Sequence, residues 1–92
     1  MAIEFDPDKD AANLDKHGLS LAEAWRVYDA PNKVTLRSPR AEESRQMAIA
    51  RVEPMGVVLA LVYVERDGVV RAISLRRASR QERRLYEDAK QD

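Results

Sequence analysis

The chain has 92 residues, of which 45% are hydrophobic, and its formal net charge is zero because 16 basic residues balance 16 acidic ones. This length fits a single domain over residues 1–92, and the apolar content excludes a disordered chain. The absence of cysteine excludes disulfides, thiolate zinc sites and cysteine nucleophiles, and it is compatible with a reducing cytoplasm.

The N-terminal residues predict a short extended segment followed by a helix. Residues 2–5 are extended, and Asp6-Pro7 supplies an N-cap residue and a proline suited to the first helical position. The helix is predicted over residues 7–17, with Gly18 as its C-cap. Because Glu4 and Asp6 lie at the start and no apolar run follows, we expect no signal peptide here.

A second helix is predicted directly after this one. Ser20 to Glu23 has the capping-box pattern, and Pro31 ends the segment. Trp25 falls on the apolar face and is predicted to be a core residue. Two helices joined by a short turn invite comparison with DNA-binding helix-turn-helix proteins, but the exposed charges of the second helix include Glu23 and Asp29, which would repel DNA phosphates.

From residue 34 onward the pattern becomes extended. The predicted segments are strands at 34–36, 46–52, 57–65 and 69–76, with a polar loop at 38–43. The third strand is apolar on both faces, as in the centre of a sheet, and its run of eight apolar residues is too short to cross a membrane as a helix. Asp67-Gly68 predicts a tight hairpin. Regular alternation after it places Arg71 with Leu75 on one face and Arg76 on the other.

The last predicted element is a short basic helix that begins at the capping box Ser79 to Glu82. Few apolar residues follow, so we expect weak anchoring of this helix by burial. The predicted fold class is therefore α+β: a small antiparallel sheet with two N-terminal helices and a short basic C-terminal helix, with one sheet face left open.

Charge is distributed unevenly along the chain. Residues 1–30 hold three basic and seven acidic residues, whereas residues 66–84 hold seven arginines against Asp67 and Glu82. An excess of arginine in one segment is the pattern of a phosphate-binding surface. The alternative is that these arginines form ion pairs with the acidic N-terminal third or remain solvated.

Two separated blocks resemble the BrnT family of toxins. The N-terminal block has Phe5-Asp6-Pro7-Asp8-Lys9, then Asn13 to Gly18, then Glu23-Ala24, which is similar to the family's "WDPxK…N…KHG…F.EA" opening, with Phe5 in place of tryptophan. The C-terminal block has Glu65-Arg66, Arg71 to Ala78 and Glu82 to Tyr86, which is similar to the ending "ER…RIISAR.A…ER..Y". The resemblance covers almost the whole chain.

The resemblance implies a RelE-like fold and an endoribonuclease toxin of a type II toxin–antitoxin system that arrests growth. It implies neutralisation by a BrnA-like antitoxin with a ribbon-helix-helix part, and contact with operator DNA only through the toxin–antitoxin complex. No cofactor, metal site or membrane contact is expected, since one histidine without cysteine cannot build a zinc site and no glycine-rich phosphate loop is present.

RNA cleavage without a metal requires a base, an acid and cations for the charge that develops on phosphorus. The predicted catalytic residues are Arg71, Arg76, Glu65 and His17. The predicted RNA-binding residues are Arg66, Arg77, Arg80, Arg83, Lys16 and Tyr86.

Each of these residues also has a structural alternative. His17 can cap the helix that ends at Gly18, Glu65 can pair with an arginine, Glu82 is explained by its capping box and Tyr86 can be a packing residue. Because the sequence identifies no unambiguous base, a non-catalytic module that binds nucleic acid or protein through the basic C-terminal surface remains an alternative function.

Overall fold

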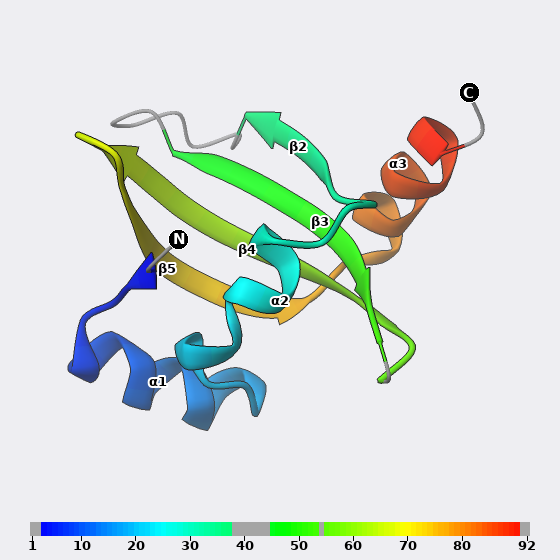
Figure 1. Cartoon of the computed structure of the whole chain (residues 1–92). Helices are drawn as coiled ribbons and strands as arrows, with labels where there is room; N and C mark the ends of the chain where they lie inside the picture. Colours follow the sequence, from blue (N-terminus) through cyan, green and yellow to red (C-terminus); the bar gives the residue numbers. More distant parts are fainter. Residues whose placement is uncertain (1–2, 38–44, 54, 91–92) are drawn as a thin grey trace.

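The computed structural model of the chain describes residues 3–37, 45–53 and 55–90 (Figure 1). The elements are β1 (Ile3–Glu4), α1 (Pro7–His17), the 3-10 turn η1 (Leu21–Glu23), α2 (Trp25–Tyr28), β2 (Val34–Arg37), β3 (Gln46–Val52), β4 (Val57–Arg66), β5 (Val69–Arg77) and α3 (Arg80–Lys90). The polar loop predicted at 38–43 lies outside the described residues. Within those residues, no helix is long and apolar enough to span a membrane.

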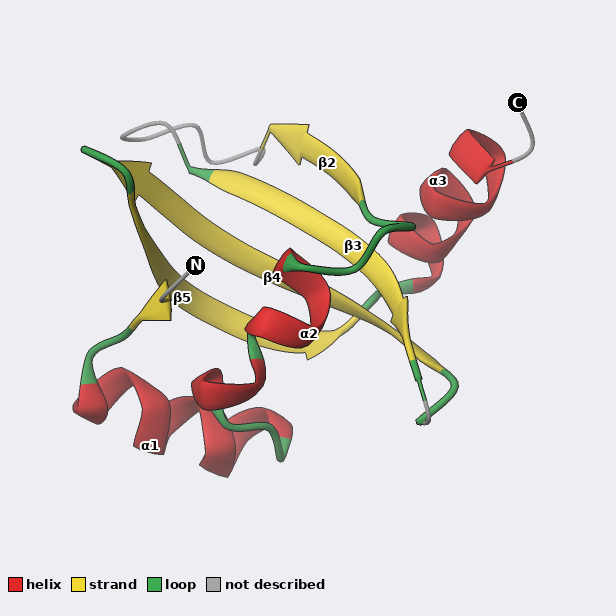
Figure 2. Ribbon diagram, viewed as in Figure 1, coloured by secondary structure: helices red, strands yellow, loops and turns green. Residues whose placement is uncertain are grey.

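The predicted α+β class is confirmed, but the expectation of a purely antiparallel sheet is wrong. The five strands have the order β1-β5-β4-β3-β2, and β1 pairs with β5 in parallel while the other neighbours are antiparallel. Figure 2 shows β1 beside β5, so the first strand joins the edge of the last one. A two-residue segment has too little pattern to reveal such a long-range pairing.

An irregularity in β5 overturns the expected distribution of its side chains. Tyr63 pairs with Ala72 and Val62 with Ser74, so Ile73 is an extra residue without a partner on β4. Such a bulge interrupts the alternation of faces. As a result Leu75 faces the same core as Ala72, and the arginines at 71 and 76 both lie on the opposite face of the sheet.

The first helix forms as predicted, and the second differs. Asp6 accepts a hydrogen bond from the backbone N–H of Asp8 at 2.8 Å, and Gly18 ends α1 with φ 73°. The second segment is not continuous, because the 3-10 turn η1 precedes the single-turn helix α2. The prediction that Trp25 lies in the core is wrong: 46% of Trp25 is exposed, and the Arg26 guanidinium lies 4.6 Å from its ring centroid.

The sheet carries a core on each face. The first core packs η1 and α2 against the sheet and includes Leu21, Ala24, Val27, Leu59, Leu61, Val70 and Leu75. The second core lies on the opposite face beneath α3 and includes Met47, Ile49, Val58, Ala60, Ala78 and Tyr86. Tyr86 is only 4% exposed, so α3 has a firmer anchor than its few apolar residues predicted.

Asn13 joins α1 to the outer edge of β5. Its Nδ2 donates to the carbonyl oxygens of Leu75 and Leu19, both at 2.8 Å, and its Oδ1 accepts from the Leu75 N–H at 3.1 Å. Asn13 is 6% exposed and is the buried polar residue within the described part of the chain. Because buried polar groups must be paired, this single amide fixes the position of α1 relative to β5.

Candidate functional site

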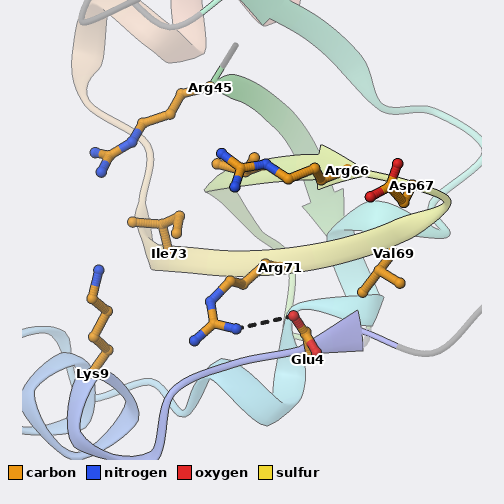
Figure 3. A pocket seen from close by; sticks show the side chains of 9 residues that line it. Glu4, Lys9, Arg45, Arg66, Asp67, Val69, Arg71 and Ile73 are labelled. Atoms are coloured by element: carbon orange, nitrogen blue, oxygen red, sulfur yellow. Dashed lines mark hydrogen bonds and ion pairs between the residues drawn. The ribbon is translucent and has the colours of Figure 1, made fainter. Parts of the chain in front are cut away.

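An open hollow with a volume of about 520 Å³ lies beside the β4–β5 hairpin (Figure 3). Its charged lining residues are Glu4, Lys9, Arg45, Arg66, Asp67 and Arg71, and its apolar lining residues are Val64, Val69 and Ile73. These residues come from β1, α1, the position just before β3, the end of β4, the hairpin turn and β5. Four cations against two carboxylates make this hollow a basic site that is open to solvent.

The local sequence explains how the hairpin presents its arginines. The turn between β4 and β5 has positive φ angles at Asp67 (54°) and Gly68 (78°), which matches the right-handed twist of the flanking strands. Arg71 then pairs in register with Val64 and with Glu4, one on each neighbouring strand. A side chain placed in the sheet between two paired strands has a well-defined position.

Arg71 and Glu4 form the ion pair of this hollow. The distance from Arg71 Nη1 to Glu4 Oε1 is 3.0 Å, and the two side chains are 48% and 53% exposed. Both groups are therefore accessible to a ligand, and such an exposed pair contributes little to stability. Figure 3 shows Lys9 of α1 on the same side as the Arg71 guanidinium.

Arg45 is one of the three arginines that line the hollow. Its Nε atom is buried and has no hydrogen-bond partner among the described residues. A buried donor without an acceptor costs free energy unless a ligand or a water molecule accepts its hydrogen bond. Lys9 and Arg45 were absent from the predicted site residues, although the first lies in the N-terminal motif block.

Arg76 lies on the same face of the sheet as Arg71, but it pairs with a carboxylate of α3 rather than with one of β1. Its guanidinium donates two hydrogen bonds to the Glu82 carboxylate, at 2.7 and 2.9 Å. Glu82 also accepts from the Ser79 N–H at 2.8 Å while the Ser79 hydroxyl accepts from the Glu82 N–H at 3.1 Å, so the predicted capping box is present. The Arg76 hydrogen bonds are the main reason that the pKa of Glu82 is lowered, and the Ser79 hydrogen bonds add to the effect.

This arrangement predicts that Glu82→Gln destabilises the protein by about 1–2 kcal/mol at neutral pH, because the charged pair and part of the cap are lost. The folded-state pKa lies below the unfolded value of about 4.3, so the stabilisation is present above that pH and is lost as the pH falls through the lowered pKa. Urea unfolding of both proteins at several pH values measures this difference in the free energy of unfolding.

Glu87→Gln is the matched control for this prediction, because Glu87 pairs with Arg51 at 3.7 Å with both side chains about half exposed. We expect it to change the unfolding free energy by less than about 0.5 kcal/mol. Equal effects of the two substitutions, or a Glu82→Gln effect that persists at acidic pH, would contradict the assigned role of the capping box.

The remaining predicted basic residues lie around α3 and the end of α1. Arg77, Arg80 and Arg83 are exposed, and none has an ion-pair partner within the described part of the chain. Lys16 is exposed and His17 is partly buried, both in the last turn of α1. Arg66 lines the hollow and has further interactions of its own.

Two predicted residues are not brought together with the arginines. Glu65 pairs in register with Val70, whose side chain belongs to the first core, so Glu65 faces away from Arg71. It accepts a hydrogen bond from the Tyr28 hydroxyl at 3.4 Å. The pKa of Tyr28 is raised mainly by burial and further by the negative charge of Glu65. Tyr86 is buried with its hydroxyl 3.4 Å from the Arg51 nitrogen, so packing accounts for it and its ring is covered.

A family comparison agrees with the sequence blocks. Residues 5–82 match the model of the family described as the ribonuclease toxin BrnT of type II toxin–antitoxin systems. The chain belongs to the BrnT family. No curated protein sequence gives a significant match to the chain.

The BrnT match contains most of the basic surface. It includes Lys9, Arg45, Arg71 and Arg76, and it ends at Glu82, whose carboxylate holds Arg76. Membership of this ribonuclease family makes RNA the substrate class to test at the hollow and makes an antitoxin the expected kind of partner.

Proposed function

We propose that this BrnT protein is a single-domain, metal-independent endoribonuclease with a RelE-like sheet, which cleaves RNA in the cytoplasm and thereby arrests growth. The observation that supports this most is the bulge at Ile73, which puts Arg71 and Arg76 on one face of the sheet. Together with Lys9, Arg45 and Arg66 of the hollow, these two arginines form a surface that can follow an RNA backbone through several phosphates.

In this proposal Arg71 binds the phosphate that is attacked. Its planar guanidinium can donate two parallel hydrogen bonds to non-bridging oxygens, and its half-exposed position leaves room for them. Arg76, held by Glu82, contacts the neighbouring stretch of RNA backbone, and the exposed residues Arg80 and Arg83 on α3 extend the cationic path. Arg77, in register with the core residue Leu59 at the end of β5, is a further proposed phosphate contact. Lys16 is a further phosphate contact, and a role for His17 or Glu65 as a base stays a prediction.

The proposed partner is a BrnA-like antitoxin with a ribbon-helix-helix part. In the toxin–antitoxin complex, this antitoxin would be the component that contacts operator DNA. The family's type II classification supports a protein antitoxin. A partner that covers the hollow would inhibit the enzyme by competing with RNA for the same cations.

We expect cleavage of RNA by the purified protein to continue at an unchanged rate in excess EDTA. Four cations in the hollow can neutralise the charge that develops on phosphorus, which is the task that a metal ion would otherwise perform. Denaturing gels of a labelled RNA, with and without EDTA, measure the rate. Loss of cleavage in EDTA with recovery on adding Mg²⁺ would show that the reaction needs a metal.

The function itself is tested by inducing the chain in cells and measuring growth and total RNA integrity. Arrest with fragmented RNA is expected. Healthy cells with intact RNA, from a chain shown to be folded, would favour the alternative of a non-catalytic binding module. The ion pairs of Arg71 and Arg76 are compatible with that alternative as well.

A further inference from the structure

Glu4 is the carboxylate nearest to the proposed phosphate ligand. It lies on β1, in register with Arg71 on β5, and its Oε1 is 3.0 Å from Arg71 Nη1. Its side chain is 53% exposed, so an oxygen can reach a ligand in the hollow without any rearrangement of the strand. Sequence alternation did not mark Glu4, because its position depends on the parallel pairing of β1.

A carboxylate at this position opposes the binding of RNA. Phosphate groups would be attracted by Lys9, Arg45 and Arg71 and repelled by Glu4, so a surface that serves binding alone would gain from its loss. As a tether for β1 it is also weak, because an ion pair half exposed to water stabilises little. Removal of a proton from RNA is a task for which a carboxylate beside the phosphate ligand is suited.

We propose that Glu4 is the general base of RNA cleavage and that Lys9 supplies the proton for the leaving group. This inference rests on the proposed ribonuclease function. Glu4 takes the proton of a ribose 2′-hydroxyl, and the resulting oxygen attacks the adjacent phosphorus while Arg71 holds the non-bridging oxygens. The new bond joins O2′ to phosphorus and the broken bond joins phosphorus to O5′.

The step is balanced within the hollow. The electron pair of the broken bond stays on O5′, which takes a proton from the Lys9 ammonium group, and Lys9 lies on the same side of the hollow as the Arg71 guanidinium (Figure 3). The products are a 2′,3′-cyclic phosphate and a 5′-hydroxyl. Glu4 ends protonated and Lys9 neutral, and exchange with water restores both.

The first test compares two isosteric substitutions in single-turnover cleavage of a labelled RNA at saturating protein. Glu4→Gln keeps a hydrogen-bond acceptor for Arg71 but cannot take a proton, and we expect a rate loss of about 100-fold or more. RNA affinity, measured by filter binding, is expected to stay equal or become tighter. Glu23→Gln makes the same substitution in a glutamate that pairs with Arg26 at 2.9 Å outside the hollow, so its rate is expected to stay within about threefold of wild type.

Three results would overturn the assignment of Glu4 while leaving the ribonuclease function intact. They are a wild-type rate in Glu4→Gln, equal losses in Glu4→Gln and Glu23→Gln, or a loss of affinity in Glu4→Gln that accounts for the loss of rate. An inactive wild-type protein whose folding is verified by thermal unfolding would instead overturn the proposed function.

A modified substrate separates the two proton transfers. RNA with sulfur in place of the bridging O5′ has a leaving group that needs no proton. We expect this substrate to restore Lys9→Ala to within about tenfold of wild type and to leave Glu4→Gln impaired by about 100-fold. Failure to rescue Lys9→Ala would remove Lys9 from the reaction, and rescue of Glu4→Gln would contradict its role as the base.

Discussion

Replacing Arg71 by alanine is expected to reduce RNA cleavage by about 10²- to 10³-fold, because loss of one group that stabilises transition-state charge has effects of this size. Arg71 is the guanidinium that β5 positions between Val64 and Glu4. Its ion pair is half exposed, so the same substitution is expected to change the unfolding free energy by less than about 1 kcal/mol. Single-turnover rates and urea unfolding measure the two effects separately.

Arg26→Ala is the matched control for this prediction. Arg26 also pairs with a glutamate, with its Nε 2.9 Å from Glu23 Oε1, and it lies on α2 rather than in the hollow. Its loss removes the same charge and is expected to leave cleavage within about threefold of wild type, because distant exposed charges are screened. Equal losses of cleavage in the two folded variants would show that Arg71 has no special place in the reaction. Arg71→Lys tests geometry, because it keeps the charge without the guanidinium fork.

The largest stability effect is expected at Asn13. Asn13→Ala removes two buried hydrogen bonds with Leu75 and a part-buried one with Leu19, and it leaves both backbone groups of Leu75 and the Leu19 carbonyl without their partner. Each buried unpaired group costs about 1–3 kcal/mol, so we expect a loss of about 3–5 kcal/mol in the free energy of unfolding. Chemical denaturation measures this loss, and a small domain can lose most of its stability in this way.

Asn32→Ala is the corresponding control. The Oδ1 atom of Asn32 is buried without a hydrogen-bond partner in the described structure, so removing this amide is expected to cost less than about 1 kcal/mol. Comparable losses at positions 13 and 32 would contradict the role assigned to the Asn13 amide. Asn13→Asp is a further check, because it keeps an acceptor for the Leu75 N–H and loses both donors.

Local sequence patterns predicted the elements that local chemistry controls. The helix from Pro7 to His17 has a cap at each end, and the Asp67-Gly68 turn fixes the hairpin, so both follow from short-range rules. Strand β4 was predicted from an apolar run that only a central strand would bury on both faces. These features depend on residues close together in the chain.

Features that depend on distant residues were missed. The parallel pairing of β1, and with it the meeting of Glu4 and Arg71, depends on residues 67 positions apart in the sequence. The bulge at Ile73 has no turn residue to mark it, so alternation placed the site's arginines on different faces. Trp25 was expected inside because it falls on the apolar face of one continuous helix, whereas the 3-10 turn η1 followed by α2 turns Leu21, Ala24 and Val27 toward the core.

The Asn13 amide has a consequence for the behaviour of the protein at high concentration. An exposed sheet edge offers backbone groups on which another molecule can add a strand, and this is a common start of aggregation. On the outer edge of β5, β1 pairs with Val70 and Arg71. The Asn13 side chain forms hydrogen bonds with the N–H and the carbonyl of Leu75, which a neighbouring strand would otherwise pair. Loss of Asn13 would therefore expose a template for intermolecular sheet growth as well as weaken the fold.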